Sequence, residues 1–373
     1  MKHVLMPDET FAIAQKGAGE IVIPIPEDGR ELLVQQTDIL KMSAKLSLAF
    51  GGVENGKLQF SDDAGAFLLV FKDTETPGSF ELKKAVRAHV LAVGGGGAGA
   101  NPGNAGLSDG GAGGGGAGGF VENESLVLAP GVYSVVVGKG GTNTVSTQQA
   151  GENGYPSYIS LGGVDKIRAL GGGGGGILTA AGGAGGSGGG GGNSYGNALQ
   201  PASEWGGLGN RGGSVNNTRA GAGGGGAGGV GGNVSVRNEG GAGGAGTNSW
   251  ITGSEIWYAA GGGGGSRTGT GGAGGLDGNG NPLGGAGGGG SSTAPVSPGN
   301  GLAGTGSGGG GGRLNGTGGS GGSGVVIVRI PLSYLYGGPM HNETMPETPT
   351  QEEMINIVKK MFVALGGEVA RNV

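Results

Sequence analysis

The stretch Gly171-Gly-Gly-Gly-Gly-Gly176 belongs to a series of glycine runs that decides the fold of this chain. All but twelve of the 104 glycines lie between residues 94 and 324. A collagen helix needs glycine strictly at every third position together with abundant proline. Consecutive glycines and a total of only 15 prolines therefore exclude collagen. Comparable runs occupy residues 94–97, 223–226, 261–265 and 308–312.

Two interpretations of this glycine block remain, a flexible linker and a packed bundle of polyglycine II helices. Composition alone favours the linker, since glycine-rich chains commonly behave as flexible coils. However, apolar and aromatic phrases interrupt the runs, for example Trp257-Tyr258-Ala259 just before residues 261–265. A flexible linker does not require apolar and aromatic segments of this kind, and we therefore expect the block to be folded.

A folded polyglycine II bundle places clear demands on the sequence. The helix has three residues per turn and no internal hydrogen bonds, so each N–H and C=O must bond to a neighbouring segment. Glycine permits this close approach because it has no Cβ, although ordering it costs much conformational entropy. We expect a lattice of parallel and antiparallel threads held by backbone hydrogen bonds. Alanine, serine, asparagine and threonine within the runs are expected to mark outward-facing positions.

The overall composition excludes several classes of protein. Charged residues make up 13% of the 373 residues and the net charge is −5, which favours neither a nucleic-acid-binding surface nor an acidic tail. The sequence has no cysteine, which excludes disulfides and thiolate chemistry. It begins without the apolar region of a secretory signal peptide, and no apolar span reaches 18 residues. We expect a soluble chain made in a cytoplasm, without membrane insertion.

Residues 1–79 are predicted to form an N-terminal β domain that serves attachment or assembly. Short apolar segments alternate with turn residues, the pattern of a compact antiparallel sandwich or barrel. The expected strands are residues 20–26, 31–34, 45–50, 57–60 and 66–71, with turns at residues 27–29, 51–56 and 62–65.

Strands are also expected where the glycine block begins and ends. Residues 80–93 lead directly into its first run, and residues 324–330 follow its last one. Residues 126–141 contain a strand, a Pro130-Gly131 turn and a second strand before further glycines. Strands at both edges of the block can pair with each other and close the domain. They would supply the apolar core that the threads lack.

Four phrases follow one another in a specific order, namely Val90-Leu-Ala-Val-Gly-Gly-Gly-Gly97, Leu128-Ala-Pro-Gly-Val-Tyr-Ser-Val-Val-Val-Gly-Lys-Gly-Gly141, Gly154-Tyr-Pro-Ser-Tyr-Ile159 and Gly321-Gly-Ser-Gly-Val-Val-Ile-Val-Arg329. In this order they resemble the glycine-rich domain common in bacteriophage tail-fibre and adhesin proteins. Glycine-rich segments of some bacterial surface proteins and animal receptor ectodomains are similar. The resemblance covers residues 80–331. It implies a polyglycine II bundle beside a β-sandwich, with loops at the bundle end that bind a host receptor.

The chain after residue 331 has a different composition. Residues 332–349 are a proline-punctuated linker, and residues 350–366 are predicted to form an amphipathic helix that starts at the capping box Thr350-Gln-Glu-Glu353. A helix of this length is only marginally stable by itself in water, so we expect it to pack against another surface. Docking on its own chain and assembly with another copy or another virion protein both remain open. The apolar stripe comprises Met354, Ile357, Val358, Met361, Phe362 and Leu365.

Catalytic, cofactor and metal sites are not indicated. Glycine motifs recur throughout the block and so say nothing about nucleotides, while Gly138-Lys139-Gly140 lacks the spacing of a phosphate loop. His3, His89 and His341 lie far apart without metal-ligand spacing. No serine, histidine and aspartate arrangement is supported. We expect no enzyme, no cofactor and no bound metal.

Aromatic residues in the polar insertions of the block are the candidate receptor contacts. Exposed aromatic rings among small polar residues are typical of adaptable binding loops. In the alternative interpretation the rings cap the ends of the glycine bundle and exclude water, and this is favoured further for Trp257 and Tyr258. The candidates are Tyr195, Trp205, Trp250, Trp257 and Tyr258.

These observations lead to one functional hypothesis and one alternative. The fold expected is mainly β, with an N-terminal β domain, a glycine-rich β-sandwich with a polyglycine II bundle, and a short C-terminal α-helix. The function expected is that of a structural virion protein, a tail fibre or receptor-binding tip, assembled in the host cytoplasm as a homo-oligomer. Its partners would be a host cell-surface receptor, protein or glycan, and other virion proteins, but no nucleic acid. The alternative is a glycine-rich bacterial surface or extracellular matrix protein.

Overall fold

The computed structural model describes most of the chain between residues 50 and 331 and a few short strands outside it. The described ranges are residues 50–61 and 66–331, without residues 104–110, 143–147, 178–179, 193–206, 216–218, 286 and 288–295, and the strands β1, β2, β3 and β16. The described residues contain strands and no helix, which confirms a mainly β chain. The predicted helix over residues 350–366 and the linker before it lie outside the described residues.

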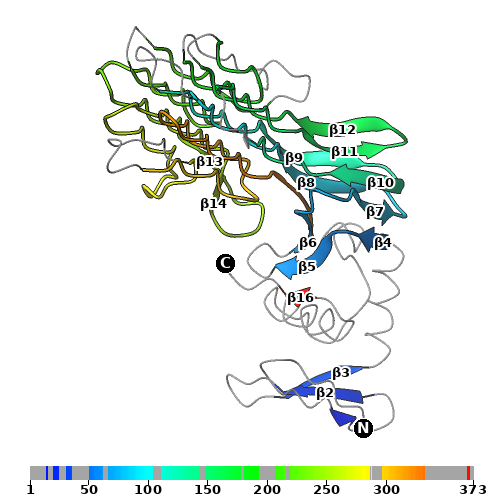
Figure 1. The fold of residues 1–373 in the computed structure, drawn as a ribbon. Helices are drawn as coiled ribbons and strands as arrows, with labels where there is room; N and C mark the ends of the chain where they lie inside the picture. The colour runs from blue at the N-terminus through cyan, green and yellow to red at the C-terminus, as the bar shows by residue number, and fades with distance from the viewer. Residues whose placement is uncertain are drawn as a thin grey trace.

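Two large sheets organise the described part of the chain (Figure 1). The first has the strand order β16-β5-β6-β15-β8-β9, and the second has the order β12-β11-β10-β7-β4. Every pairing in them is antiparallel except that of β16 with β5. The six strands of the first sheet are β16 (Glu368–Val369), β5 (Lys57–Ser61), β6 (Ala66–Phe71), β15 (Val325–Pro331), β8 (Val86–Val93) and β9 (Phe120–Leu128). The five strands of the second are β12 (Val164–Ala169), β11 (Ser157–Leu161), β10 (Gly131–Val136), β7 (Gly78–Leu82) and β4 (Phe50–Glu54).

The strands at the two edges of the glycine block do pair with each other. β15 lies against β8, with Val325 opposite Val93 and Ile327 opposite Leu91. This confirms the predicted closure of the domain. Strands that begin before residue 80 join the same sheets, because β6 pairs with β15 and β7 (which spans residue 80) pairs with β10. The two sheets therefore continue across residue 79.

The N-terminal strands partly follow the prediction. A separate antiparallel sheet contains β1 (Ala14–Gln15), β2 (Glu20–Pro24) and β3 (Glu31–Gln35), which confirms the strands expected near residues 20 and 31. The turn predicted over residues 51–56 is wrong for residues 51–54, which belong to β4. Only Asn55, with φ 51°, and Gly56 form the turn. Adjacent glycines suggested a longer turn, yet extended glycine fits the irregular pairing of β4 with β7.

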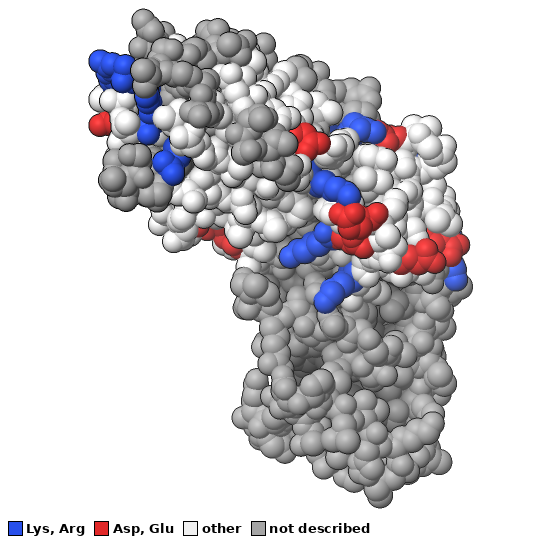
Figure 2. Space-filling view, viewed as in Figure 1, with Lys and Arg blue, Asp and Glu red and all other residues white. Residues whose placement is uncertain are grey.

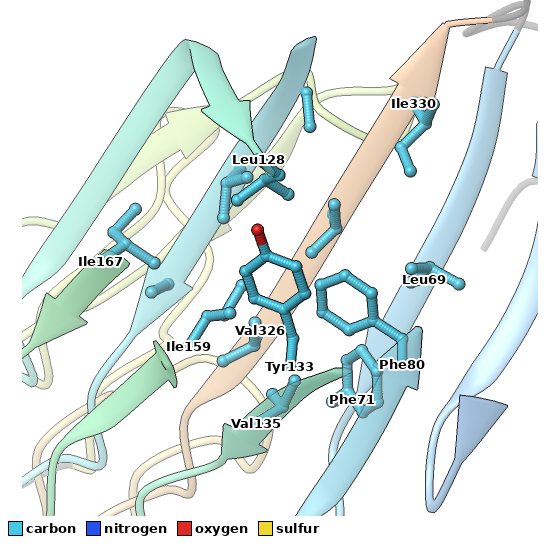
Figure 3. Close-up of a cluster of buried hydrophobic side chains, with 14 of the residues drawn as sticks. Leu69, Phe71, Phe80, Leu128, Tyr133, Val135, Ile159, Ile167, Val326 and Ile330 are labelled. Carbon is cyan, nitrogen blue, oxygen red and sulfur yellow. The ribbon is translucent and has the colours of Figure 1, made fainter. Parts of the chain in front are cut away.

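Side chains from both sheets form one hydrophobic cluster (Figure 3). Phe80 of β7 stacks on Tyr133 of β10 at 4.8 Å between ring centroids, and Phe71 of β6 lies 6.1 Å from Phe80. The Tyr133 hydroxyl donates a 2.8 Å hydrogen bond to the Ala129 carbonyl, at the corner where β9 of one sheet continues into β10 of the other. Such a bond fixes the corner between two layers of strands. The remaining labelled members are Leu69, Leu128, Val135, Ile159, Ile167, Val326 and Ile330.

The glycine runs continue from these strands as extended threads without a β ladder. Thread 94–101 follows β8, and a thread that we call the central thread, residues 112–119, leads into β9. Gly94, Gly97 and Ala100 donate to the carbonyls of Gly119, Gly116 and Gly113. The same neighbour is therefore met at every third residue, whereas a β ladder meets it at every second. This periodicity is that of an extended helix with three residues per turn.

The central thread is surrounded on all sides by backbone. Its N–H groups donate in rotation to threads 170–176, 222–225 and 306–312. Its carbonyls accept from threads 94–100, 187–190 and 262–265. The bonds to thread 222–225 run parallel and the others run antiparallel, since partner numbers rise in the first case and fall in the rest. These contacts confirm the predicted lattice of threads held by backbone hydrogen bonds.

The spacing of the threads leaves no room for a Cβ at most run positions. A Cβ on Gly173 would lie 1.9 Å from the Gly183 carbonyl oxygen, and one on Gly95 would lie 1.9 Å from that of Lys139. Both distances are far below van der Waals contact, so the close approach depends on glycine at these positions.

The prediction that small side chains in the runs face outward is wrong for residues inside the bundle, although Ala184, Ala242, Ala245 and Ala273 are exposed as predicted. Ala98, Ala112, Ala117, Ser187 and Ser307 are all fully buried. Several of the alanines instead pack with one another or with isolated aliphatic residues. Ala100, Ala112 and Ile177 form one such cluster, and Ala220, Ala222 and Val234 form another. With threads on every side, a methyl group inside the bundle fills a space between threads rather than reaching the surface.

Candidate functional site

A short aromatic hairpin interrupts the thread bundle on the side of the six-stranded sheet. It consists of β13 (Thr247–Ser249) and β14 (Ile256–Tyr258), which pair in antiparallel register. Thread 240–246 leads into it, and thread 261–265 leaves it (Figure 1). Ala259 follows β14 with φ 57°, a left-handed conformation that is unusual for a residue other than glycine. Its N–H and C=O are both bonded, to Thr305 and Ala227 at 2.7 Å each, and these bonds hold the conformation in place.

The inner side of the hairpin covers the outer face of the six-stranded sheet. Ile251 is fully buried and Tyr258 is 3% exposed, both in a cluster with Leu91, Phe120 and Ile327. The rings of Phe120 and Tyr258 lie 6.3 Å apart and are tilted by 44°. Burial, and then the nearby Glu122 carboxylate, raise the pKa of Tyr258 well above its ordinary value. The hairpin is therefore anchored from below.

A polar contact also ties the hairpin to the sheet. The Glu122 carboxylate of β9 lies 2.7 Å from Nε2 of His89 on β8 and accepts a 2.5 Å hydrogen bond from the Ser249 hydroxyl. Ser249 Oγ in turn accepts the N–H of Ile251 at 3.1 Å. His89 and Ser249 both bond Oε1 of Glu122, so the imidazole is not positioned to act as a base on the serine hydroxyl. The arrangement holds the hairpin and does not resemble a nucleophile with its base.

Trp250 is the aromatic residue that this anchoring presents to solvent. It is 59% exposed, between the buried residues Ser249 and Ile251, and its carbonyl accepts a 3.0 Å hydrogen bond from Gly253. Across the hairpin the Asn248 amide donates to Glu255 at 2.6 Å. An exposed ring on so constrained a backbone loses little conformational entropy when it binds a partner.

Trp257 differs from Trp250 because its ring is partly covered. A Cβ on Gly278 would lie 2.2 Å from Cζ2 of Trp257, so the indole packs directly against the backbone at Gly278. Its Nε1 is buried and has no hydrogen-bond partner among the described residues. Trp257 and Tyr258 both pack against their own chain, and the capping interpretation stays a prediction.

The structure brings three of the five candidate aromatics together in this hairpin. Tyr195 and Trp205 lie outside the described residues, as do the predicted helix residues Met354, Ile357, Val358, Met361, Phe362 and Leu365. Among the described aromatics, the receptor-contact interpretation therefore depends on Trp250.

A set of arginines that the sequence patterns above do not indicate lies at the opposite end of the bundle. Arg219, Arg237, Arg267 and Arg313 each lie within a few residues of a glycine run. Figure 2 shows basic side chains gathered at the end of the bundle far from the sheets. These arginines stand out in the sequence because charged residues are scarce in the glycine block. Only the hydrogen bonds between the threads show that they share one end of the bundle.

The described residues contain no group of three or more histidine, cysteine, aspartate or glutamate residues arranged to hold a metal ion. No helix in the same part of the chain is long and apolar enough to cross a membrane.

Comparison with models of protein families shows the family of this chain. No curated protein matches the chain. A family model described as a glycine-rich domain matches residues 74–331, which extends from just before β7 to the end of β15. The match includes both strands that close the domain and every thread of the bundle. The chain therefore belongs to the glycine-rich domain family.

Proposed function

We propose that this chain is a structural virion protein of a tailed bacteriophage, part of a tail fibre or receptor-binding tip. The observation that carries the proposal is Trp250, an exposed indole held on a hairpin that is anchored both to a sheet and to glycine threads. A stiff scaffold that presents such a residue suits attachment to a surface. The resemblance of its phrases to tail-fibre and adhesin domains supports the same function.

The proposal also includes features of the architecture that the strand pairings alone do not establish. The two large sheets would form a β-sandwich, and the threads would be polyglycine II helices. The hydrophobic cluster shared by the two sheets and the three-residue bonding period support these assignments. Residues 350–366 would form a helix for assembly with another copy or another virion protein, and residues 1–79 would serve attachment to the particle.

The proposed protein acts by binding and not by catalysis. Its partners would be a receptor on the host surface, protein or glycan, and other virion proteins. Several copies would act together, so that modest single contacts give strong attachment through avidity. The protein would be assembled in the host cytoplasm and reside in the virion.

The alternative is a glycine-rich protein of a bacterial surface or extracellular matrix. The same thread bundle suits that role, because backbone-bonded glycine is stiff whatever it carries. Immunogold labelling of purified phage particles separates the two: label on the tail supports the virion proposal, and label on producing cells alone supports the alternative.

Binding of the purified chain to a panel of bacterial strains tests the role of Trp250. Truncation of a central aromatic contact typically costs about 2 kcal/mol or more, which corresponds to roughly 30-fold in affinity. We expect Trp250→Ala to weaken single-molecule binding by about this factor with an unchanged melting temperature. Val164→Ala, at a residue 61% exposed on β12, is the matched control and should change neither. Lost stability with intact binding would show that Trp250 caps the bundle instead.

A further inference from the structure

Four arginines lie at the thread ends that are farthest from the sheets. β8 runs into thread 94–101 and the central thread returns to β9, so residues 101 and 111 lie at this far end. The arginines are at the same level, because each occurs where a thread that contacts this end starts or turns: Arg219, Arg237, Arg267 and Arg313.

Backbone contacts place these four thread ends next to one another. Gly111 forms a bridge with Arg313, and a Cβ on Gly111 would lie 2.4 Å from both the Cα of Ala220 and the carbonyl oxygen of Gly265. The N–H of Arg267 donates to the carbonyl of Arg219 at 3.2 Å. The hydroxyl of Ser266 donates to the carbonyl of Asn238, the residue after Arg237. The four arginines therefore belong to one contiguous surface, which we call the arginine end.

Charges of opposite sign are separated along the bundle. Among the described residues between 170 and 324, Glu239 is the only carboxylate at the arginine end. Glu255 and Asp277 lie in turns at the end near the sheets. Seven thread residues, such as 240–246, span about 20 Å at roughly 3.1 Å per residue. This exceeds a Debye length of about 8 Å at physiological salt, so the distant carboxylates do not neutralise the arginines.

We propose that the arginine end binds a phosphorylated surface glycan. This inference rests on the proposed attachment function and names the chemical class of its receptor. Guanidinium groups bind phosphate oxygens with paired hydrogen bonds and stay charged at any physiological pH. Exposed Asn233, Thr268 and Asn315 lie beside the arginines and provide hydrogen-bonding groups suited to sugar hydroxyls.

Two other polyanions fit this surface less well. Single-stranded nucleic acid is usually held by aromatic rings that stack on its bases, and the described residues of the arginine end include no aromatic side chain. Peripheral membrane binding usually involves an apolar face that enters the headgroup region. The large exposed apolar side chains that the structure describes near this end are single valines, Val236 and Val296, rather than an apolar face.

Binding to immobilised poly(glycerol phosphate), measured by surface plasmon resonance, tests the inference. We expect the full chain to bind, to bind more weakly as salt rises, and to ignore neutral dextran. The double variant Arg237→Gln/Arg313→Gln should bind about tenfold more weakly or worse. Arg211→Gln is the matched control, because Arg211 is exposed on the bundle beside residues nearer the sheets, and it should leave binding unchanged. Glu239→Gln removes the one opposing charge that the structure describes at this end and should tighten binding, even if the double variant proves unstable.

Several results would overturn the inference. They are equal losses for Arg211→Gln and the double variant, equal binding to dextran, or tighter binding to a single-stranded oligonucleotide or to phosphatidylglycerol vesicles than to poly(glycerol phosphate). Cell attachment separates this inference from the proposed function. Attachment that survives the double variant but not Trp250→Ala removes the arginine end and keeps the function. Polymer binding without attachment to any strain, and without tail labelling, keeps the arginine end and removes the function.

Discussion

The two-sheet core and the thread bundle are stabilised in opposite ways, although they are parts of one domain. In the sheets, large side chains such as Phe80 and Tyr133 fill the space between strands. In the bundle, the backbone itself fills that space, and the central thread bonds to six neighbouring threads. The first region thus depends on side chains being present and the second on side chains being absent. In the bundle, therefore, glycine cannot be exchanged for another small residue without a loss of stability.

A buried polar side chain, that of Ser157, lies at one transition between the two regions. Ser157, at the start of β11, donates a 2.6 Å hydrogen bond to the carbonyl of Val93, the last residue of β8. Its oxygen also accepts the N–H of Gly138 at 2.9 Å. A serine can supply both bonds where the regular ladder stops and the three-residue period has begun. At this junction the serine therefore pairs one backbone carbonyl and one backbone N–H that lie outside the ladder.

The largest effect is expected in the sheet core. Phe80→Ala removes a ring that contacts both Phe71 and Tyr133, and large-to-small changes of this kind cost about 3–5 kcal/mol. Thermal or denaturant unfolding measures the loss. Val132→Ala serves as the control on the neighbouring strand, since Val132 is 62% exposed, and should shift stability by less than about 0.5 kcal/mol. Similar losses for both variants would contradict a core held by specific side chains.

A smaller but still substantial effect is expected from adding one methyl group to a thread. Gly173→Ala places a Cβ 1.9 Å from a backbone oxygen that cannot rotate away, and overpacking of this kind costs about 1–3 kcal/mol. Gly52→Ala is the matched change in β4, where no atom lies within 4 Å of the new Cβ. There the unfolded chain loses entropy and stability should stay equal or rise by up to about 1 kcal/mol. Equal, small effects at both positions would return the block to the linker interpretation.

The sequence predicted where the strands of this fold lie better than it predicted which segments lie next to one another. Short apolar segments bounded by turn residues or glycine runs located β6, β8 and β15, and the pairing of strands across the block followed from their position at its edges. The neighbours of residues 171–176 could not be predicted in the same way. One glycine run is chemically identical to the next, so no side chain specifies which thread it contacts.

Burial was the second property that the sequence could not supply. Trp250 and Tyr258 occur in the same aromatic-polar insertion, yet one is 59% and the other 3% exposed. Which face of a three-residue hairpin strand meets the sheet depends on the position of thread 240–246, which the residues of the hairpin do not encode. Alanines inside the bundle, such as Ala112 and Ala117, were misjudged for a related reason. With threads on all sides, their methyl groups have no outward direction to take, whereas Ala242 and Ala245 on an outer thread are exposed.

The smallest effect is expected at Lys139, which meets the bundle through its backbone. Its carbonyl accepts the N–H of Tyr155 at 3.0 Å, while its ammonium forms an exposed 2.7 Å ion pair with Glu75. That pair lowers the pKa of Glu75, but exposed pairs contribute little to stability. Lys139→Ala should therefore shift the melting temperature by less than about 2 °C. Gly95→Ala alters the other side of the same contact, because its Cβ would lie 1.9 Å from the Lys139 oxygen, and should produce a much larger shift. If removal of the lysine side chain proved as damaging as addition of the methyl group, the bundle would depend on its side chains as the sheets do, and the distinction between the two regions would fail.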